Sequence, residues 1–228
     1  MIPAPHVVAI NGIRTPTTAD SWPKRLIPHL ESRWHCTGEA HYYRTGPIPP
    51  VNLWFVNPRI ARVLASAIEA RMEEIGIHPL HLVAHSNGTN IAVSLASALA
   101  RRQIRVETML LIGSALHSDV ERNGLGELVA GGHVRRAIAY CSPDDLVVRR
   151  LQNFPGFYGS LGARGFERDG QATGLRVERT QPLGDEWGSD RIRYVTRLFP
   201  GMGHSGYFEP GQREETFACI ASDLRLSA

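Results

Sequence analysis

Residues 82–89 are Leu82-Val83-Ala84-His85-Ser86-Asn87-Gly88-Thr89, and they join an apolar run to the alanine-rich segment Ile91–Ala100. A serine on a sharp turn between a strand and a helix needs very small neighbours two positions before and after it, because the two backbones crowd there. Ala84 and Gly88 are such neighbours, although glycine is more usual at the first of these positions. The stretch therefore predicts a strand, a tight turn and a helix, with Ser86 as a candidate nucleophile at the turn.

Short apolar runs alternate with helical patterns along the whole chain. This alternation predicts an α/β protein with a mostly parallel central sheet of about six strands and helices on both faces. The expected strands are Val7–Ile10, Leu80–Val83, Thr108–Ile112, Ala137–Tyr140 and Ile192–Leu198, with Trp34–Tyr43 as a weaker sixth.

The clearest helix pattern begins at Asn57-Pro58, where an N-cap residue precedes a proline at the first helical position. Apolar residues then recur at helical spacing as far as Ile75, and Gly76 is expected to end the helix. Two further helices are expected over Asn87–Arg101 and Gln212–Leu224.

Composition excludes several classes of protein. The 228 residues are enough for one domain, 1–228, and no linker or repeat suggests a second. The net charge is +3 and Lys24 is the single lysine among 25 basic residues, but no basic stripe indicates nucleic-acid binding. No cationic leader with a long apolar core is present, and no segment reaches the ~18 apolar residues of a membrane span, so a cytoplasmic protein is expected.

The cysteines and histidines do not form a metal-binding pattern. Cys36, Cys141 and Cys219 are odd in number and widely spaced, which disfavours a disulfide framework or a zinc site. His78 and His81 flank Pro79 without an evident third ligand. No metal and no cofactor are expected.

A serine hydroxyl becomes a good nucleophile only when a histidine accepts its proton and a carboxylate orients that histidine. His204 is the candidate base, because it lies in the glycine-rich segment Phe199–Gly206 just after the last expected strand. Asp145 is the preferred acid, since it follows a strand and its apolar successors are expected to pack inward. Asp144, beside it, and Asp119, after the preceding strand, are the alternatives.

An oxyanion hole requires two backbone N–H groups, one from the residue after the nucleophile and one from the loop after an early strand. Asn87 is expected to supply the first. The turn Asn11-Gly12-Ile13 ends the first expected strand, so the second donor is the N–H of Ile13 or of Gly12.

With Asn-Gly-Ile at 11–13, Ala-His-Ser-Asn-Gly at 84–88, Asp-Leu-Val-Val at 145–148 and Gly-Met-Gly-His at 201–204, the chain resembles the α/β-hydrolase superfamily, and within it lipases and esterases. The resemblance runs from about residue 6 to residue 220. It implies Ser86 as nucleophile, Asp145 as acid and His204 as base. It also implies that the turn at Ser86, called a nucleophile elbow, lies at the centre of the sheet. It also implies a version trimmed at the N-terminus, without the first two strands. Asn11-Gly12 stands where many lipases have His-Gly.

We therefore expect a serine hydrolase that cleaves a carboxylic ester, of a small molecule or a lipid, through a covalent acyl-enzyme. Thioester cleavage or acyl transfer on the same triad is an alternative reaction, and a catalytically silent binding domain is an alternative of another class. Acyl and alcohol specificity and oligomeric state are left undetermined.

Two stretches rich in Pro, Gly and aromatic residues, 45–56 and 151–170, have no regular period and are expected to be pocket-wall or lid loops. Aromatic and apolar side chains in these stretches, or just before the first of them, are candidates for an apolar acyl pocket: Tyr42, Tyr43, Pro47 to Pro50, Leu53, Trp54, Phe55, Phe154, Phe157 and Tyr158.

Overall fold

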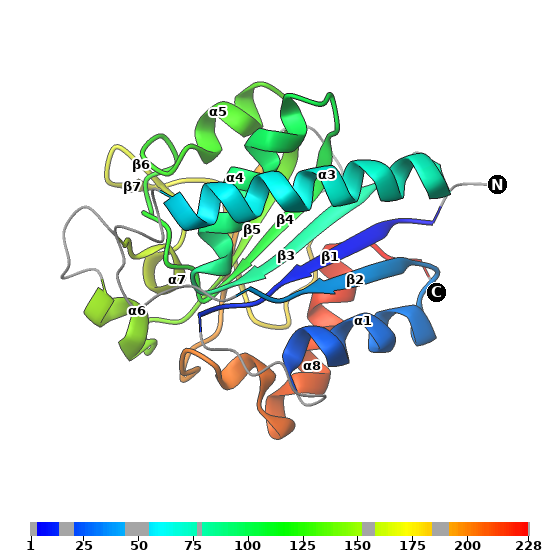
Figure 1. Cartoon of the computed structure of the whole chain (residues 1–228). Helices are drawn as coiled ribbons and strands as arrows, with labels where there is room; N and C mark the ends of the chain where they lie inside the picture. Colours follow the sequence, from blue (N-terminus) through cyan, green and yellow to red (C-terminus); the bar gives the residue numbers. More distant parts are fainter. Residues whose placement is uncertain are drawn as a thin grey trace.

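In the computed structural model, strands and helices alternate along the chain as expected (Figure 1). The structure describes residues 4–13, 21–43, 55–76, 79–151, 158–183 and 192–227. The strands are β1 (His6–Ile10), β2 (Thr37–His41), β3 (Leu80–His85), β4 (Val106–Ile112), β5 (Val134–Cys141), β6 (Glu167–Arg168), β7 (Gln171–Ala172), β8 (Leu175–Glu178) and β9 (Tyr194–Leu198). The helices are α1 (Trp22–Arg33), α3 (Asn57–Ile75), α4 (Gly88–Ala100), α5 (Leu125–Ala130), α6 (Leu146–Leu151), α7 (Leu161–Arg164), the short 3-10 helix η3 (Gly206–Phe208) and α8 (Pro210–Asp223).

The central sheet has seven strands in the order β2-β1-β3-β4-β5-β9-β8. Each neighbouring pair is parallel. The sheet agrees with the expected mostly parallel sheet of about six strands. Strand β8 was not among the expected ones, because it has only four residues and the alternation Leu-Arg-Val-Glu is too short to stand out. The weakly predicted strand within Trp34–Tyr43 is β2, at one edge of the sheet.

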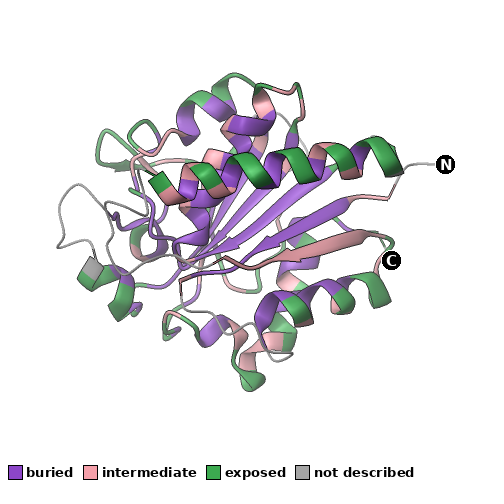
Figure 2. Cartoon of the chain, in the orientation of Figure 1, coloured by how far each residue is buried: buried purple, intermediate pink, exposed green. Residues whose placement is uncertain are grey.

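Helices cover both faces of the sheet, as the alternation predicted. Figure 1 shows α3, α4 and α5 on one face and α1 and α8 on the other. Each layer has its own apolar core, one built with α3, α4 and α5 and the other with α1 and α8. All residues of β1 and β3 are buried, as central strands of a parallel sheet should be (Figure 2). The turn that follows β3 therefore has a rigid support.

The three expected helices are present at nearly the expected positions. Gly76 ends α3 with φ 86°, a conformation that glycine adopts without strain. The prediction that Asn57 is an N-cap was wrong: α3 includes Asn57 and Val56 precedes it, without a side-chain cap bond. The amide of Asn57 is engaged instead with Asn87.

Helix α1 was not predicted, since Pro23 and Pro28 interrupt its pattern. Pro23 occupies the first turn, where its missing N–H costs nothing, whereas Pro28 lies inside the helix. Burial of Trp22, Leu26 and Leu30 in the core outweighs that local cost.

The stretch 151–170 is more regular than expected. Residues 152–157 lie outside the described ranges, but α7 follows at Leu161–Arg164 and β6 pairs antiparallel with β7. Two glycines allow this stretch to pack closely against the backbone of the segment after β4. A Cβ on Gly159 would lie 2.1 Å from the Cα of His117, and one on Gly162 would lie 2.4 Å from the backbone N of Ser114. Of the other predicted loop, 45–56, residues 45–54 also lie outside the description. No helix in the described ranges is long and apolar enough to cross a membrane.

Candidate active site

Ser86 lies on the sharp turn between β3 and α4, with a backbone φ of 55°. A non-glycine residue in this left-handed region is strained, and such strain is typical of a nucleophile elbow. The need for glycine two residues later is direct, because a Cβ on Gly88 would lie 2.3 Å from the carbonyl oxygen of Asn11. The turn thus presses the start of α4 against the end of β1.

The carbonyl of Ser86 is held by its own helix. The Oγ1 of Thr89 donates a hydrogen bond of 2.6 Å to it, and Thr89 in turn accepts one of 3.0 Å from the Oγ of Ser114. Thr89 and Ser114, which make these hydrogen bonds, are buried, and Ser86 is partly exposed. The hydroxyl of Ser86 is therefore presented from a fixed backbone.

Two other strands bring an imidazole and a carboxylate to this hydroxyl. The Nε2 of His204, in the loop after β9, lies 2.9 Å from the Oγ of Ser86. The Nδ1 of His204 lies 2.8 Å from the Oδ2 of Asp145, which follows β5. Asp145 is fully buried, and its other oxygen accepts a hydrogen bond of 3.0 Å from the backbone N–H of Val148. Three residues that are far apart in sequence thus form one hydrogen-bonded chain.

The two alternative carboxylates have other roles. Asp144 is exposed, and its Oδ2 accepts a hydrogen bond of 2.7 Å from the N–H of Gly201. Asp119 accepts one of 2.9 Å from the N–H of Glu121, and this bond is the main cause that lowers the pKa of its carboxyl. The position beside Nδ1 of His204 is occupied by Asp145.

The predicted oxyanion elements adjoin the elbow. Gly12 is buried against it, and a Cβ there would lie 2.9 Å from the Cβ of Ser86, so a larger residue would displace the serine. Ile13 follows, half-buried. Asn87 directly precedes the first residue of α4, where backbone N–H groups lack partners within the helix and the helix dipole favours negative charge.

Sequence reasoning did not find the side-chain partner of Asn87. Asn57 and Asn87 are both 1% exposed, and their amides pair reciprocally at 3.2 and 3.3 Å. The phenol of Tyr43 faces Asn87 as well, and its burial raises the pKa of Tyr43 well above the ordinary value. The sequence singled out Asn57 only as a predicted N-cap, and this was the one feature that drew attention to its amide.

A cleft of about 310 Å³ lies between the start of α3, the first turns of α4 and the segment after β4, and neither Ser86 nor His204 is among its lining residues. Its lining is mixed in polarity: Asn57, Asn90, Val93, Ser94, Ala115, Leu116, His117, Arg122, Asn123, Tyr158 and Gly159. A larger hollow of about 650 Å³ lies at the opposite end of the strands, where β3 and β4 begin.

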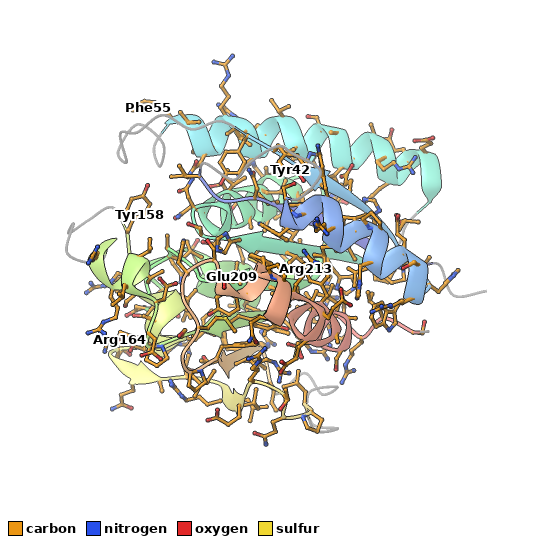
Figure 3. All side chains as sticks on the ribbon, turned by 90° about the horizontal axis from the view of Figure 1, so that it is seen from below. Tyr42, Phe55, Tyr158, Arg164, Glu209 and Arg213 are labelled. Atoms are coloured by element: carbon orange, nitrogen blue, oxygen red, sulfur yellow. The ribbon has the colours of Figure 1, made fainter. Side chains whose placement is uncertain are left out.

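Few of the side chains expected to form an apolar pocket can be located. Pro47 to Pro50, Leu53, Trp54, Phe154 and Phe157 lie outside the described ranges. Figure 3 shows Phe55 and Tyr158 at the same end of the molecule, but Phe55 is 68% exposed. The hydroxyl of Tyr42 is hydrogen-bonded to the Oγ of Ser21 at 2.7 Å. Of the expected residues that the structure describes, Tyr158 alone lines the cleft.

In the described ranges, no three His, Cys, Asp or Glu side chains are grouped so that they could hold a metal ion. The three cysteines form no disulfide with one another. Cys141 is buried and the other two are half-buried.

Solved esterases share this arrangement of strands and helices. The esterase from the archaeon Pyrobaculum calidifontis is 15% identical with a TM-score of 0.58, over 98% of this chain and 77% of that one. Carboxyl esterase 2 from the mycorrhizal fungus Tuber melanosporum is 10% identical with a TM-score of 0.57, over 99% and 78%. An uncharacterized protein from Bacillus cereus is 11% identical with a TM-score of 0.56, and this chain spans only 58% of its length. The sequence matches no protein-family model and no curated protein sequence.

The chain therefore shares the α/β-hydrolase fold of these solved esterases. At these identities the similarity is one of fold, and the chemistry of this protein depends on its own side chains.

Proposed function

We propose that the protein is a serine hydrolase that cleaves a carboxylic ester. The observation that carries this proposal is the continuous hydrogen-bonded chain from the Oγ of Ser86 through the ring of His204 to Asp145, starting at a strained turn. Geometry of this kind is what nucleophilic acyl transfer requires.

In the first half of the reaction, Nε2 of His204 accepts the proton of Ser86 as Oγ attacks the acyl carbon. The negative charge that develops on the substrate oxygen is stabilised by the N–H of Asn87 and that of Ile13 or Gly12. The intermediate collapses, the bond to the alcohol breaks, and His204 gives its proton to the departing alcohol. An acyl group then remains on Ser86.

In the second half, His204 takes a proton from water, and the resulting hydroxide attacks the acyl carbon. Collapse of the second intermediate returns the proton to Ser86 and releases the acid. Throughout, Asp145 keeps the proton of the imidazole on Nδ1 and stabilises the charged ring.

A fluorophosphonate probe and two chromogenic esters test the assignment. We expect the probe to label Ser86, and p-nitrophenyl acetate and butyrate to be hydrolysed by the wild type. Ser86→Ala should abolish labelling and reduce turnover by about a thousandfold or more. Undiminished turnover in this variant would refute the proposal. Parallel assays with a butyryl thioester, and with butanol as acceptor, measure thioester cleavage and acyl transfer by the same serine.

A further inference from the structure

His85, the residue before Ser86, contacts the main chain of His204. Its side chain is buried, and Nε2 of its ring lies 2.9 Å from the carbonyl oxygen of His204. A carbonyl oxygen can only accept, so Nε2 of His85 carries the proton and donates. The last residue of β3 is thereby joined directly to the loop that follows β9.

Burial keeps this donor unchanged over a wide pH range. Desolvation of the ring, together with the nearby charge of His204, lowers the pKa of His85 from 6.5 to about 3. The ring of His85 is therefore neutral around neutral pH, and its one ring proton stays on the nitrogen that the carbonyl requires.

Aromatic rings and a glycine hold the imidazole of His85 in place. Trp22 of α1 and Phe208 of η3 stack on each other with centroids 4.6 Å apart, and both meet His85 edge-on, at 6.4 and 5.2 Å. A Cβ on Gly12 would lie 3.2 Å from Nδ1 of the ring, so a larger residue would press on it. The ring thus lies among α1, η3 and the turn after β1.

The loop that carries His204 includes Gly201 and Gly203, and a Cβ at either position would meet no atom within 4 Å. Met202, between them, is buried in the core, so the loop is held by this side chain and by hydrogen bonds. On one side the N–H of Gly201 is held by Asp144. The bond from His85 to the carbonyl of His204 is the corresponding anchor at the base itself.

We propose that His85 is a positioning residue: its Nε2–H fixes the main chain of His204, so that the imidazole stays aligned between Ser86 and Asp145. This inference rests on the proposed function, because alignment matters only if His204 acts as a base. It assigns His85 a role in holding the base, in addition to its packing against Trp22 and Phe208.

Three substitutions of His85 separate the effect of the hydrogen bond from the effect of the space that the ring fills. His85→Phe fills the slot without a donor. His85→Gln retains an N–H donor near the position of Nε2, whereas the shorter amide in His85→Asn ends near the position of Nδ1. His81→Phe is the matched control, since His81 is also buried on β3, at 3% exposed.

We expect His85→Phe to lower kcat for p-nitrophenyl butyrate by about tenfold to a hundredfold, the cost of a displacement of a catalytic group by about 1 Å, with KM within about twofold. His85→Gln should recover most of kcat, and His85→Asn should not. The low-field proton NMR signal of the Nδ1–H of His204 should broaden in the Phe and Asn variants and persist in the Gln variant. His81→Phe should leave kcat and the signal unchanged.

Equal kcat values for the Gln and Asn variants, or a wild-type kcat in the Phe variant, would overturn the inference. If His85→Phe fails to fold, the comparison of Gln with Asn still decides, because both are polar amides. Should the wild type show neither turnover nor labelling, the proposed function fails. The His204 signal then still shows whether His85 aligns that ring.

Discussion

The carboxylate of Asp145 lies 2.8 Å from the ring of His204 and is fully buried, whereas its neighbour Asp144 is exposed and holds the N–H of Gly201. Asp145→Asn should reduce kcat for p-nitrophenyl butyrate by about a thousandfold to ten-thousandfold, because an amide cannot hold the proton of the imidazole on Nδ1. Asp144→Asn keeps an oxygen for Gly201 and should change kcat by about twofold at most. Asp119→Asn serves as a second control, and a large loss there with none at Asp145 would reverse the assignment.

Gly88 should tolerate no side chain. A Cβ there would lie 2.3 Å from the carbonyl oxygen of Asn11, which belongs to the backbone and cannot swing away. We expect Gly88→Ala to lower the free energy of unfolding by about 1–3 kcal/mol in urea titrations, and to slow labelling of Ser86, because α4 is pushed from the end of β1. Gly211→Ala, in α8 and with no atom within 4 Å of its Cβ, should be neutral or stabilise by up to about 1 kcal/mol. Equal effects of the two substitutions would contradict this account.

The paired amides of Asn57 and Asn87 should be coupled energetically. Asn57→Ala leaves the buried amide of Asn87 without its main partner and should cost about 1–3 kcal/mol of unfolding free energy. A double-mutant cycle with Asn87→Ala, measured by urea unfolding, should give an interaction energy of about 0.5 kcal/mol or more. Additivity to within about 0.3 kcal/mol would show that the pair contributes no specific stability.

His81 should make the folded state sensitive to mild acid. Burial lowers its pKa from 6.5 to about 4, and its Nδ1 has no partner among the described residues. The unfolded chain therefore binds a proton near pH 6.5 that the folded protein takes up only near pH 4, so stability is lost as pH falls through this window. The loss amounts to at most about 3 kcal/mol.

The His81→Phe variant lacks the loss of stability that protonation of His81 causes. Urea unfolding at pH 7 and at pH 4.5 should show a smaller decrease in the variant than in the wild type. An equal decrease in both proteins would mean that His81 is already protonated, or is hydrated, in the folded state.

Much of the fold follows from local patterns. The runs at β1, β3, β4, β5 and β9 are apolar because these strands are buried on both faces, and burial leaves a direct trace in composition. Elements whose trace is short or interrupted were missed: β8 has four residues, and α1 contains Pro28. Their stability comes from packing onto β9 and onto the core with α8, and such contacts have no local signature.

The candidate site divides in the same way. Ser86, Gly88 and the glycine-rich segment around His204 can be recognised from a few neighbouring residues, because a tight turn restricts which side chains can stand beside it. The partners that hold these residues could not be recognised: Asn57 is 30 positions from Asn87, and His85 is 119 positions from His204.

The chain order alone indicated an elbow with Ser86 at its tip, a parallel sheet around it and a histidine after the last strand, since each of these depends on residues close together in sequence. The sequence favoured Asp145 over Asp144 as the acid, and the folded molecule adds the contacts that distinguish the two side chains. Two adjacent residues differ mainly in the direction of their side chains, and that direction is set by how the turn after β5 packs against the loop after β9. The cleft lined by Asn57 and Asn90 likewise exists only because the fold brings α3, α4 and the segment after β4 together.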